Sequence, residues 1–443
     1  MKKVLSYPQK MHRKRLLPLY RLQVFERYAF YGLKSIVSIF LIKHLNVSKQ
    51  ETINITHTLF SIAFILPLFV SFCADVVFSK AKFLKFGLSF YLCTIAVVIF
   101  FHSSKTTFIL SMLFIIVSNS IIRSTLPSFI VDQNKASEEG YDAKVAGSFV
   151  KHTFAVNIGM FLGLLTIPVI LKEFGSKTVF FVTFVCILIS NLFFYYSYRI
   201  YIKKPPQKAN TIFKFLKEIP IVGSDKNPRS WLHIGAFLLM VSCFYFVLEQ
   251  KYSIWIMQGE TMDRNLFGYV LPSNIMLSFM PAMTLIILHL YERYFFKWLE
   301  KIGIKSLLDR VNFGILLATL CPLSVGIIQF FIDKGYKVHL LTQLIPYLLL
   351  VLADIAVYLS GIQYMYTQIS QTHRTIAGSI WFLVGAMGNI WVVIFTNLLD
   401  TSKLTPSLFL KSAVVSFIAS ILFKFMVNKK RHKLQINQTS NKT

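Results

Sequence analysis

Ionisable side chains lie inside stretches of this sequence that are otherwise apolar enough to cross a membrane. Residues 23–34 read QVFERYAFYGLK, which puts Glu26, Arg27 and Lys34 in one such stretch. A charge at bilayer depth is costly unless it is paired or faces water. Residues three, four, seven and eleven positions apart share a helix face, so this segment is expected to carry one polar and aromatic stripe. The stripe comprises Gln23, Glu26, Arg27, Phe30, Tyr31 and Lys34.

The stripe is expected to face a water-filled cavity or partner helices; the alternative is a buried ion-pair network that fixes helix packing. Deep charges in other stretches favour the cavity. Arg123 adds a cation to the N-terminal half, and Asp354 places an anion in the C-terminal half. Opposite charges attract strongly where water is partly excluded. Such a cavity suits a zwitterion, with its carboxylate at Lys34 and Arg123 and its ammonium group at Asp354.

Long apolar helices are needed to position these charges. The chain of 443 residues is 55% hydrophobic and 15% charged, whereas soluble domains are about a quarter charged. Apolar runs of about 20 residues predict an all-α integral membrane protein with twelve transmembrane helices. The predicted spans are 22–45, 53–78, 83–102, 107–131, 146–171, 178–202, 231–256, 266–290, 311–333, 339–367, 374–399 and 404–427.

The net charge of +28 is distributed in a way that orients the chain in a membrane. On the predicted topology, 32 of the 47 Lys and Arg residues lie on the side of the two termini and eight on the opposite side. This bias is the positive-inside rule, so both termini are expected to be cytoplasmic. The basic surplus is therefore expected to meet anionic lipid headgroups and not nucleic acid.

The longest polar segment, residues 203–230, is rich in Lys and Pro and divides the spans six and six. Two six-helix bundles joined by a basic linker fit the major facilitator fold, in which the substrate site lies at the midplane between the halves. The predicted domains are a basic cytoplasmic tail (1–21), an N-terminal bundle (22–202), a cytoplasmic linker (203–230), a C-terminal bundle (231–427) and a second basic tail (428–443).

The residue patterns of other chemistries do not occur in the sequence. The five cysteines lie in apolar spans without CxxC spacing, which argues against a disulfide framework or a zinc site. Neither HExxH nor GxSxG occurs, so the chain is not expected to be an enzyme and no catalytic residue, metal or cofactor is predicted. The basic first twenty residues lack the apolar core of a signal peptide.

Several segments resemble motifs of the proton-dependent oligopeptide transporters, the POT or PTR family of the major facilitator superfamily. QVFERYAFYGLK is similar to the family's ExxERFxYYG motif, and FYFVLEQKYSIW at 244–255 resembles its seventh-helix pattern FWxxF(D/E)QxxSxW. The matches occur in order along both halves of the chain. The other matching segments are 57–75, 121–133, 152–159, 354–370 and 379–389.

The resemblance implies uptake of di- and tripeptides by proton-coupled symport. It implies that Lys34 and Arg123 bind the peptide carboxylate and that Asp354 receives the peptide amino group. Tyr31 and Asn157 match residues that contact the peptide backbone. The implied coupling and gating residues are the first-helix pair Glu26 and Arg27, and the seventh-helix acid Glu249, which would form a gating salt bridge.

Departures from the family pattern leave the proton coupling and the identity of the cargo open. Gln23 stands where the motif has its first glutamate, and glutamine cannot exchange a proton. His57 is the expected compensation. The unperturbed pKa of a histidine is near 6.5, and His57 lies ten residues before Pro67, at the spacing of the coupling histidine in animal peptide transporters. Phe64 replaces a usual tyrosine and so removes a hydroxyl group that could contact substrate.

An alternative function keeps the fold and changes the cargo to another small zwitterion or anion, with weakened or absent proton coupling. The expected partners are the peptide, protons and the lipid bilayer, and the protein is expected to be a monomer. The compact loops suit a multi-pass protein of the bacterial inner membrane. Side-chain preference is not encoded in these motifs, because it depends on the three-dimensional shape of the cavity.

Overall fold

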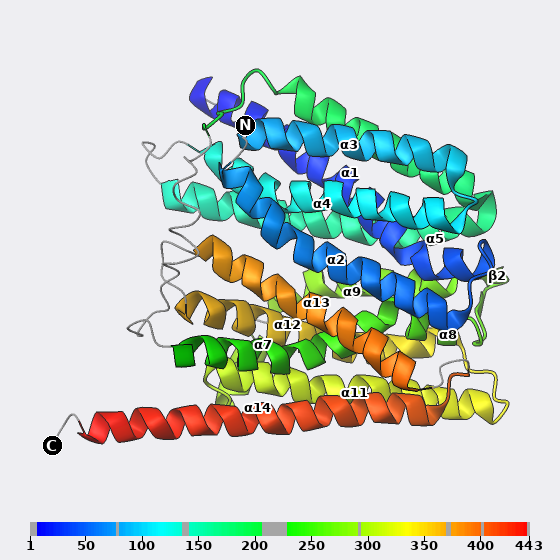
Figure 1. The fold of residues 1–443 in the computed structure, drawn as a ribbon, viewed down its shortest axis with the longest axis vertical. Coiled ribbons are helices and arrows are strands. Elements are labelled where there is room, and N and C mark those ends of the chain that lie inside the picture. Colours follow the sequence, from blue (N-terminus) through cyan, green and yellow to red (C-terminus); the bar gives the residue numbers. More distant parts are fainter. Residues whose placement is uncertain are drawn as a thin grey trace, which may run out of the picture. The chain divides into compact units, whose positions relative to one another are not determined.

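The structure of the chain, a computed structural model, is almost entirely helical (Figure 1). It describes residues 7–76, 79–134, 141–205, 228–290, 294–368, 374–399 and 403–440. Nine helices in these ranges are long and apolar enough to cross a membrane, so the chain is an integral membrane protein. The first helix is not among the nine, and one 56-residue helix counts once although two spans were predicted there. Twelve membrane crossings therefore remain a prediction.

The chain divides into two compact units. Unit 1 comprises Met1–Ser48, Ile62–Lys217 and Leu277–Ala282, and unit 2 comprises Lys49–Ser61, Glu218–Met276 and Met283–Thr443. One long helix, α2, contributes its first residues to unit 2 and the rest to unit 1. The predicted boundaries at 22–202 and 231–427 stay predictions, and residues 206–227 of the predicted linker lie outside the described residues.

Unit 1 is built from the first five helices. Their bounds are α1 (Tyr7–Lys43), α2 (Lys49–Val76), α3 (Lys80–Phe101), α4 (Lys105–Asp132) and α5 (Tyr141–Tyr196). α5 bends at Gly175, where φ is 78°, a left-handed conformation that glycine adopts without a steric penalty. The bend separates the two spans predicted at 146–171 and 178–202. The first helix begins at Tyr7, so most of the predicted N-terminal tail is helical.

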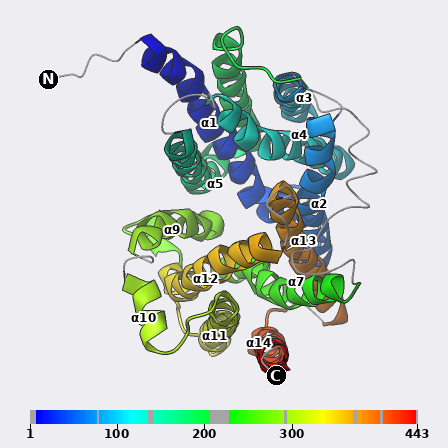
Figure 2. The ribbon, with the colours of Figure 1, turned by 90° about the vertical axis from the view of Figure 1, so that its left-hand side faces the viewer.

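Unit 2 holds the remaining elements. They are α7 (Pro228–Glu249), η1 (Gln250–Tyr252), α8 (Ile254–Gly259), β1 (Asn265–Leu266), β2 (Tyr269–Val270), η2 (Ser273–Ser278), α9 (Phe279–Leu290), α10 (Phe296–Lys301), α11 (Leu307–Asp333), η4 (Leu340–Gln343), α12 (Leu344–Gln368), α13 (Arg374–Leu398) and α14 (Pro406–Ser440). The junction between η2 and α9 is shared with unit 1. Several helices are seen nearly end-on in Figure 2.

One predicted span of the second half is wrong in detail, and a second one, 231–256, is confirmed as a candidate membrane span but contains a local interruption. The span 266–290 does not begin as a helix, because Asn265–Val270 form an antiparallel hairpin whose turn residues Phe267 and Gly268 have φ of 50° and 86°. A two-residue hairpin turn needs positive φ, which the glycine supplies. The span 231–256 is interrupted at Ser253, where φ is −137° and ψ is −80°. Hydropathy averaged over some twenty residues does not register either break, because each break depends on the backbone conformation of one or two residues.

Small residues let the helices of unit 1 approach closely. Gly159 and Gly163 of α5 lie against the backbone carbonyl oxygens of Val24 and Tyr28 of α1, and a side chain at Gly32 would meet Ile167. Close backbone approach through glycines is the usual way in which membrane helices associate, because lipid offers no hydrophobic driving force between them. This crossing fixes the register of the polar stripe of α1 against α5.

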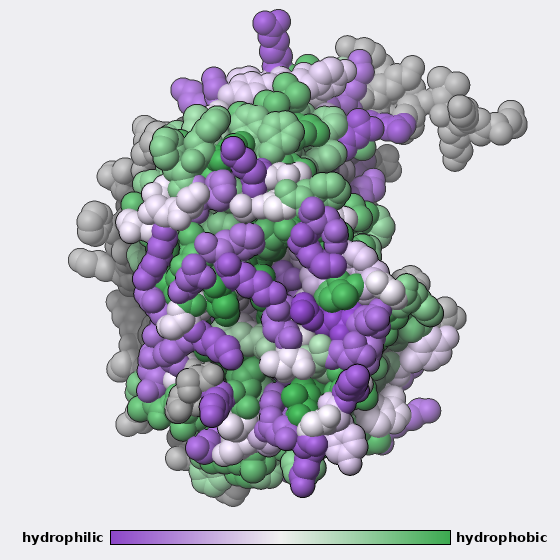
Figure 3. All heavy atoms as spheres, turned by 90° about the vertical axis from the view of Figure 1, so that its right-hand side faces the viewer, coloured by the Kyte–Doolittle hydropathy of each residue, from purple (hydrophilic) through white to green (hydrophobic). Residues whose placement is uncertain are grey.

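The core of unit 2 is aromatic. Phe237 of α7 packs against Tyr364 of α12, with ring centroids 4.7 Å apart, and against Trp381 of α13 at 6.3 Å. The Trp381 ring lies against Gly361, whose lack of a side chain makes room for it. Figure 3 shows many hydrophilic side chains, interspersed with apolar ones, on the face that it draws.

Substitution of Gly163 by Ala is expected to destabilise unit 1, because the added methyl group would collide with the Tyr28 carbonyl and approach the Gly32 nitrogen to 3.1 Å. Overpacking of this kind costs about 1–3 kcal/mol. The measurement is the thermal melting temperature of the detergent-solubilised protein. Gly147→Ala is the matched control on the same helix, since no atom lies within 4 Å of its added methyl group. Equal melting temperatures for the two variants would contradict the close crossing.

Candidate functional site

A buried ion pair lies at the centre of unit 1. Arg27 Nε donates to Glu26 Oε2 at 2.6 Å, and both side chains are almost completely buried. Gln23 Nε2 donates to the same oxygen at 3.2 Å, and Asn119 Nδ2 of α4 donates to Glu26 Oε1 at 2.8 Å. Three donors therefore meet one carboxylate, which compensates for the loss of water around a buried charge.

The network explains how the chain accommodates glutamine at position 23. A carboxylate there would face Glu26, and two buried like charges repel. The amide of Gln23 instead donates a hydrogen bond to Glu26. At Gln23, Glu26 and Arg27 the stripe is thus a buried ion-pair network against a partner helix, the arrangement given above as the alternative to a water-filled cavity. Asn119, which the sequence analysis missed, is an amide on the otherwise apolar helix 105–132.

Lys34 and Arg123 are brought to one aromatic ring. Lys34 Nζ lies 5.6 Å and Arg123 Cζ 5.4 Å from the ring centroid of Phe64. The three residues come from α1, α4 and α2, and all belong to unit 1. A cation over an aromatic face is stabilised by the ring quadrupole, more so where water is scarce. Phe64 thus has two cations within 5.6 Å of its ring centroid, and two positive charges at one side chain attract an anion.

The helices that carry these cations are held together beside them. Ser124 Oγ of α4 donates to the Pro67 carbonyl oxygen of α2 at 3.2 Å, one residue after Arg123 and three after Phe64. Tyr31 is half-buried on α1, with its ring 5.5 Å from that of Phe30. Asn157 on α5 is buried, and its Nδ2 donates to the Thr153 carbonyl oxygen at 2.9 Å. All belong to unit 1.

The acidic residues predicted for the second half belong to unit 2. Glu249 is the last residue of α7 and is buried, and Asp354 is half-buried on α12. Lys251 lies in the interruption after α7, where Nζ donates to the Leu248 carbonyl oxygen at 2.8 Å and lies 4.6 Å from the Tyr252 ring centroid.

His57 is fully buried in unit 2, with both ring nitrogens in hydrogen bonds. Nδ1 lies 2.7 Å from Asn389 Oδ1 of α13, and Nε2 lies 2.7 Å from Ser253 Oγ, at the interruption between α7 and α8. Asn389 Nδ2 donates to the Gly385 carbonyl oxygen at 2.8 Å, which turns its oxygen toward the imidazole. His57 Nδ1 is therefore the donor to Asn389, and Nε2 accepts from Ser253 while the ring is neutral.

The segment of α2 that carries His57 is bound to α13 along its length. Ser61 Oγ donates to the Ala386 carbonyl oxygen at 3.3 Å. The Asn397 side chain accepts from Gln50 at 2.9 Å and exchanges hydrogen bonds with Asn54 at 3.1 Å. These contacts explain why the first residues of α2 belong to unit 2. Ser253 and Asn389 lie in the matched segments 244–255 and 379–389, but no residue pattern in these segments predicts that they bind His57.

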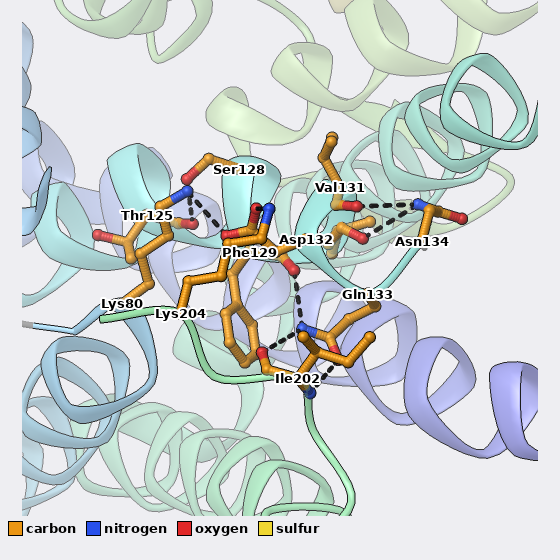
Figure 4. A network of polar contacts seen from close by, with 11 residues as sticks. Lys80, Thr125, Ser128, Phe129, Val131, Asp132, Gln133, Asn134, Ile202 and Lys204 are labelled. Atoms are coloured by element: carbon orange, nitrogen blue, oxygen red, sulfur yellow. Dashed lines mark hydrogen bonds and ion pairs between the residues drawn. The ribbon is translucent and has the colours of Figure 1, made fainter. Parts of the chain in front are cut away.

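A second polar network joins the end of α4 to the chain after α5 (Figure 4). Asp132 accepts from Lys80 Nζ at 2.8 Å and from Lys204 Nζ at 2.7 Å. Gln133 exchanges two hydrogen bonds with the backbone of Ile202, at 2.9 and 3.2 Å. The hydrogen bond that Lys204 donates to Asp132 raises the pKa of Lys204 above its ordinary value. The pair is therefore formed at neutral pH and is lost as the pH rises through that raised pKa.

The fold is that of solved membrane transporters. A crystal structure of the POT family transporter PepTSo superposes with a TM-score of 0.84 over 97% of this chain and 99% of that one, at 19% identity. A POT family transporter in complex with 5-aminolevulinic acid superposes with a TM-score of 0.77 over 94% of this chain and 96% of that one, at 15% identity. The architecture is thus the major facilitator fold of these transporters.

The sequence also matches the model of the POT family over residues 74–230 and 225–415, and the chain belongs to this family. Peptide transporter 3 of Caenorhabditis elegans is 24% identical over 351 residues, covering 70% of this chain and 50% of that protein. Dipeptide and tripeptide permease A of Cronobacter turicensis is 22% identical over 254 residues, covering 57% of this chain and 46% of that protein. The chain spans about half the length of these curated relatives.

Substitution of Asn119 by Leu is expected to lower stability, because Glu26 Oε1 loses the donor from α4 inside unit 1. A buried acceptor without its partner costs about 1–3 kcal/mol, and more when it is charged. The measurement is again the melting temperature in detergent. Ser120→Ala is the control on the same helix, since its hydroxyl group bonds to the backbone of its own helix at Ile116. If the Asn119→Leu variant has the same melting temperature as the wild type, the hydrogen bond to Glu26 is not what holds α4 to α1.

Proposed function

We propose that the protein carries di- and tripeptides across the membrane by alternating access, in symport with protons. The observation that carries this proposal is the pair of cations Lys34 and Arg123 at the ring of Phe64. The family membership supports it, and so do the relatives described as peptide transporter and as dipeptide and tripeptide permease.

The peptide carboxylate is the natural ligand of the two cations. A guanidinium group and an ammonium group can together donate several charge-assisted hydrogen bonds to one carboxylate, which are about twice as strong as neutral ones. In the proposal, Asp354 of unit 2 receives the peptide amino group, and Tyr31 and Asn157 contact the peptide backbone.

His57 is proposed as the proton carrier. The neutral ring donates from Nδ1 to Asn389 and accepts from Ser253 at Nε2. A proton added at Nε2 turns that nitrogen into a donor, so the Ser253 hydroxyl has to rotate its hydrogen away. The same step places a positive charge on His57, whose partner Ser253 follows Lys251 by two residues in the sequence. Protonation would thus weaken the attachment of α2 to the interruption in α7.

The other ionisable residues take supporting roles in the proposal. Glu26 and Arg27 form the coupling pair, with Glu26 held by donors on α1 and α4. Glu249 forms the gating salt bridge at the end of α7. The protein is proposed to be a monomer in the bacterial inner membrane, with both termini cytoplasmic, and to act without enzymatic activity.

A second candidate cargo is another small zwitterion. The solved POT family transporter with 5-aminolevulinic acid has a ligand that carries a carboxyl and an amino group without being a peptide. The ring of Phe64, which lacks the usual hydroxyl group, offers the cargo no hydrogen bond at this point. The charges at Lys34, Arg123 and Asp354 suit both kinds of cargo.

Purified protein in liposomes is expected to take up labelled dialanine, faster when the outside is acidic than when the pH is equal on both sides. Unlabelled di- and tripeptides should compete, and tetrapeptides and free amino acids should not. Competition by free amino acids or 5-aminolevulinic acid, with none by dipeptides, would favour the second cargo. Uptake that is insensitive to the pH step would mean facilitated diffusion.

Substitution of His57 by Gln is expected to abolish the acceleration by an inward proton gradient, because glutamine keeps hydrogen bonds to Asn389 and Ser253 but cannot exchange a proton. Counterflow of peptide at equal pH should persist, since exchange needs no net proton movement. His102→Gln is the control, a histidine of unit 1 that bonds to backbone at Val98 and Ile99. A His57→Gln variant with unchanged pH dependence would transfer the role to Glu26, Glu249 or Asp354.

A further inference from the structure

Two lysines lie over tyrosine rings along one edge of unit 1. Lys85 Nζ of α3 is 5.6 Å from the ring centroid of Tyr195, and Lys203 Nζ is 3.9 Å from that of Tyr198. The two rings are neighbours at the end of α5, with centroids 6.2 Å apart. The ammonium groups are thus set against aromatic faces that orient them.

The same edge has more positive than negative charge. Asp132 pairs with both Lys80 and Lys204 (Figure 4). Lys80 is the first residue of α3, the helix that carries Lys85, and Lys204 directly follows Lys203. One carboxylate therefore balances one of two lysines, and Lys85 and Lys203 add two further cations that are exposed. An anion that meets this edge finds an excess of ammonium groups from two segments of unit 1.

The position of Lys85 along α3 indicates how deep in the membrane this edge of unit 1 lies. It lies five residues after the start of α3, which is about 7.5 Å along a helix. Ser89 Oγ lies 3.3 Å from the Tyr195 hydroxyl, so the tyrosine extends one turn deeper than Lys85. Charges at this depth belong to the boundary between headgroups and acyl chains, where lysines and tyrosines of membrane proteins gather.

An apolar surface continues from the lysines along the same helix. Phe86 is 56% exposed and stacks on Phe90, with ring centroids 5.7 Å apart. Phe90 in turn meets Phe114 of α4, also at 5.7 Å, and Phe114 is 49% exposed. The row of partly exposed rings begins one residue after Lys85, and a cation followed along a helix by exposed apolar rings is a pattern that a phospholipid fits.

We propose that this edge is a binding site for an anionic phospholipid, with the headgroup phosphate between Lys85 and Lys203 and an acyl chain along Phe86 and Phe90. Charge complementarity selects an anionic headgroup, and the adjoining aromatic row selects a lipid over a soluble anion. On the proposed topology the site lies in the cytoplasmic leaflet. It is separate from the peptide site and does not depend on transport.

The site would also act on the segment that leaves α5. Lys203 and Lys204 are consecutive, and Gln133 and Asp132 hold this segment to the end of α4 through Ile202 and Lys204. A phosphate bound at Lys203 adds a third attachment to the same segment. Lipid binding is therefore expected to raise the melting temperature of the protein in detergent.

The test is native mass spectrometry of the full-length protein titrated with phosphatidylglycerol and with phosphatidylcholine of the same acyl chains. Each lysine near an anionic leaflet contributes a factor of about five in affinity, so Lys85→Gln/Lys203→Gln should bind phosphatidylglycerol about 25-fold more weakly. Lys172→Gln/Lys177→Gln is the matched control, since it removes two exposed lysines of α5 at the other end of unit 1. The control and the Lys85→Arg/Lys203→Arg variant should bind like the wild type.

Three outcomes would overturn the proposal. The first is equal retention of phosphatidylglycerol and phosphatidylcholine by the wild type. The second is an equal loss of binding in the control and in the double glutamine variant, which would show general attraction to basic helix ends. The third is displacement of the lipid by inorganic phosphate at the same concentration, which would assign the site to a free anion. Uptake of dialanine by the double glutamine variant shows whether the variant is folded.

Discussion

The cost of placing a charge in an apolar interior governs how this chain folds. Two deeply buried ionisable groups, one in the described part of each unit, accept or share hydrogen bonds with side chains of other helices. Glu26 of α1 is bound by Asn119 of α4, and His57 of α2 by Asn389 of α13. The polar contacts therefore specify which helices pair and in which register, a choice that apolar side chains alone leave open in a bilayer.

The helical architecture could be predicted because hydropathy and length determine where a chain crosses a membrane. The predicted spans 266–290 and 231–256 each contain a break that was not predicted, and both breaks have local causes. The hairpin at Asn265–Val270 depends on the positive φ of Phe267 and Gly268, and the interruption before α8 depends on the conformation of Ser253. A hydropathy average over some twenty residues dilutes such single-residue features. The bend at Gly175 falls between the predicted spans 146–171 and 178–202, where the apolar run is broken by Lys172, Glu173 and Lys177.

The site could be predicted in part. Lys34 and Arg123 were expected to meet one carboxylate, and the structure brings both to the ring of Phe64, a residue that had been considered for its missing hydroxyl group. Asn119, Asn389 and Ser253 were missed, because an amide or hydroxyl group on an apolar helix is not distinctive until its partner is known. Gln23, which suggested a weakened coupling site, is a hydrogen-bond donor to Glu26.

The central claim is that Lys34 and Arg123 bind the carboxylate of the cargo. The most direct test is the affinity of the purified protein for dialanine and for dialanine amide, whose C-terminus carries no charge. Charge-assisted hydrogen bonds are worth about 1.5–3 kcal/mol each, so the amide should bind about 10–100-fold more weakly, and Lys34→Gln/Arg123→Gln should remove the difference. Equal affinity of the wild type for the two ligands would contradict the account.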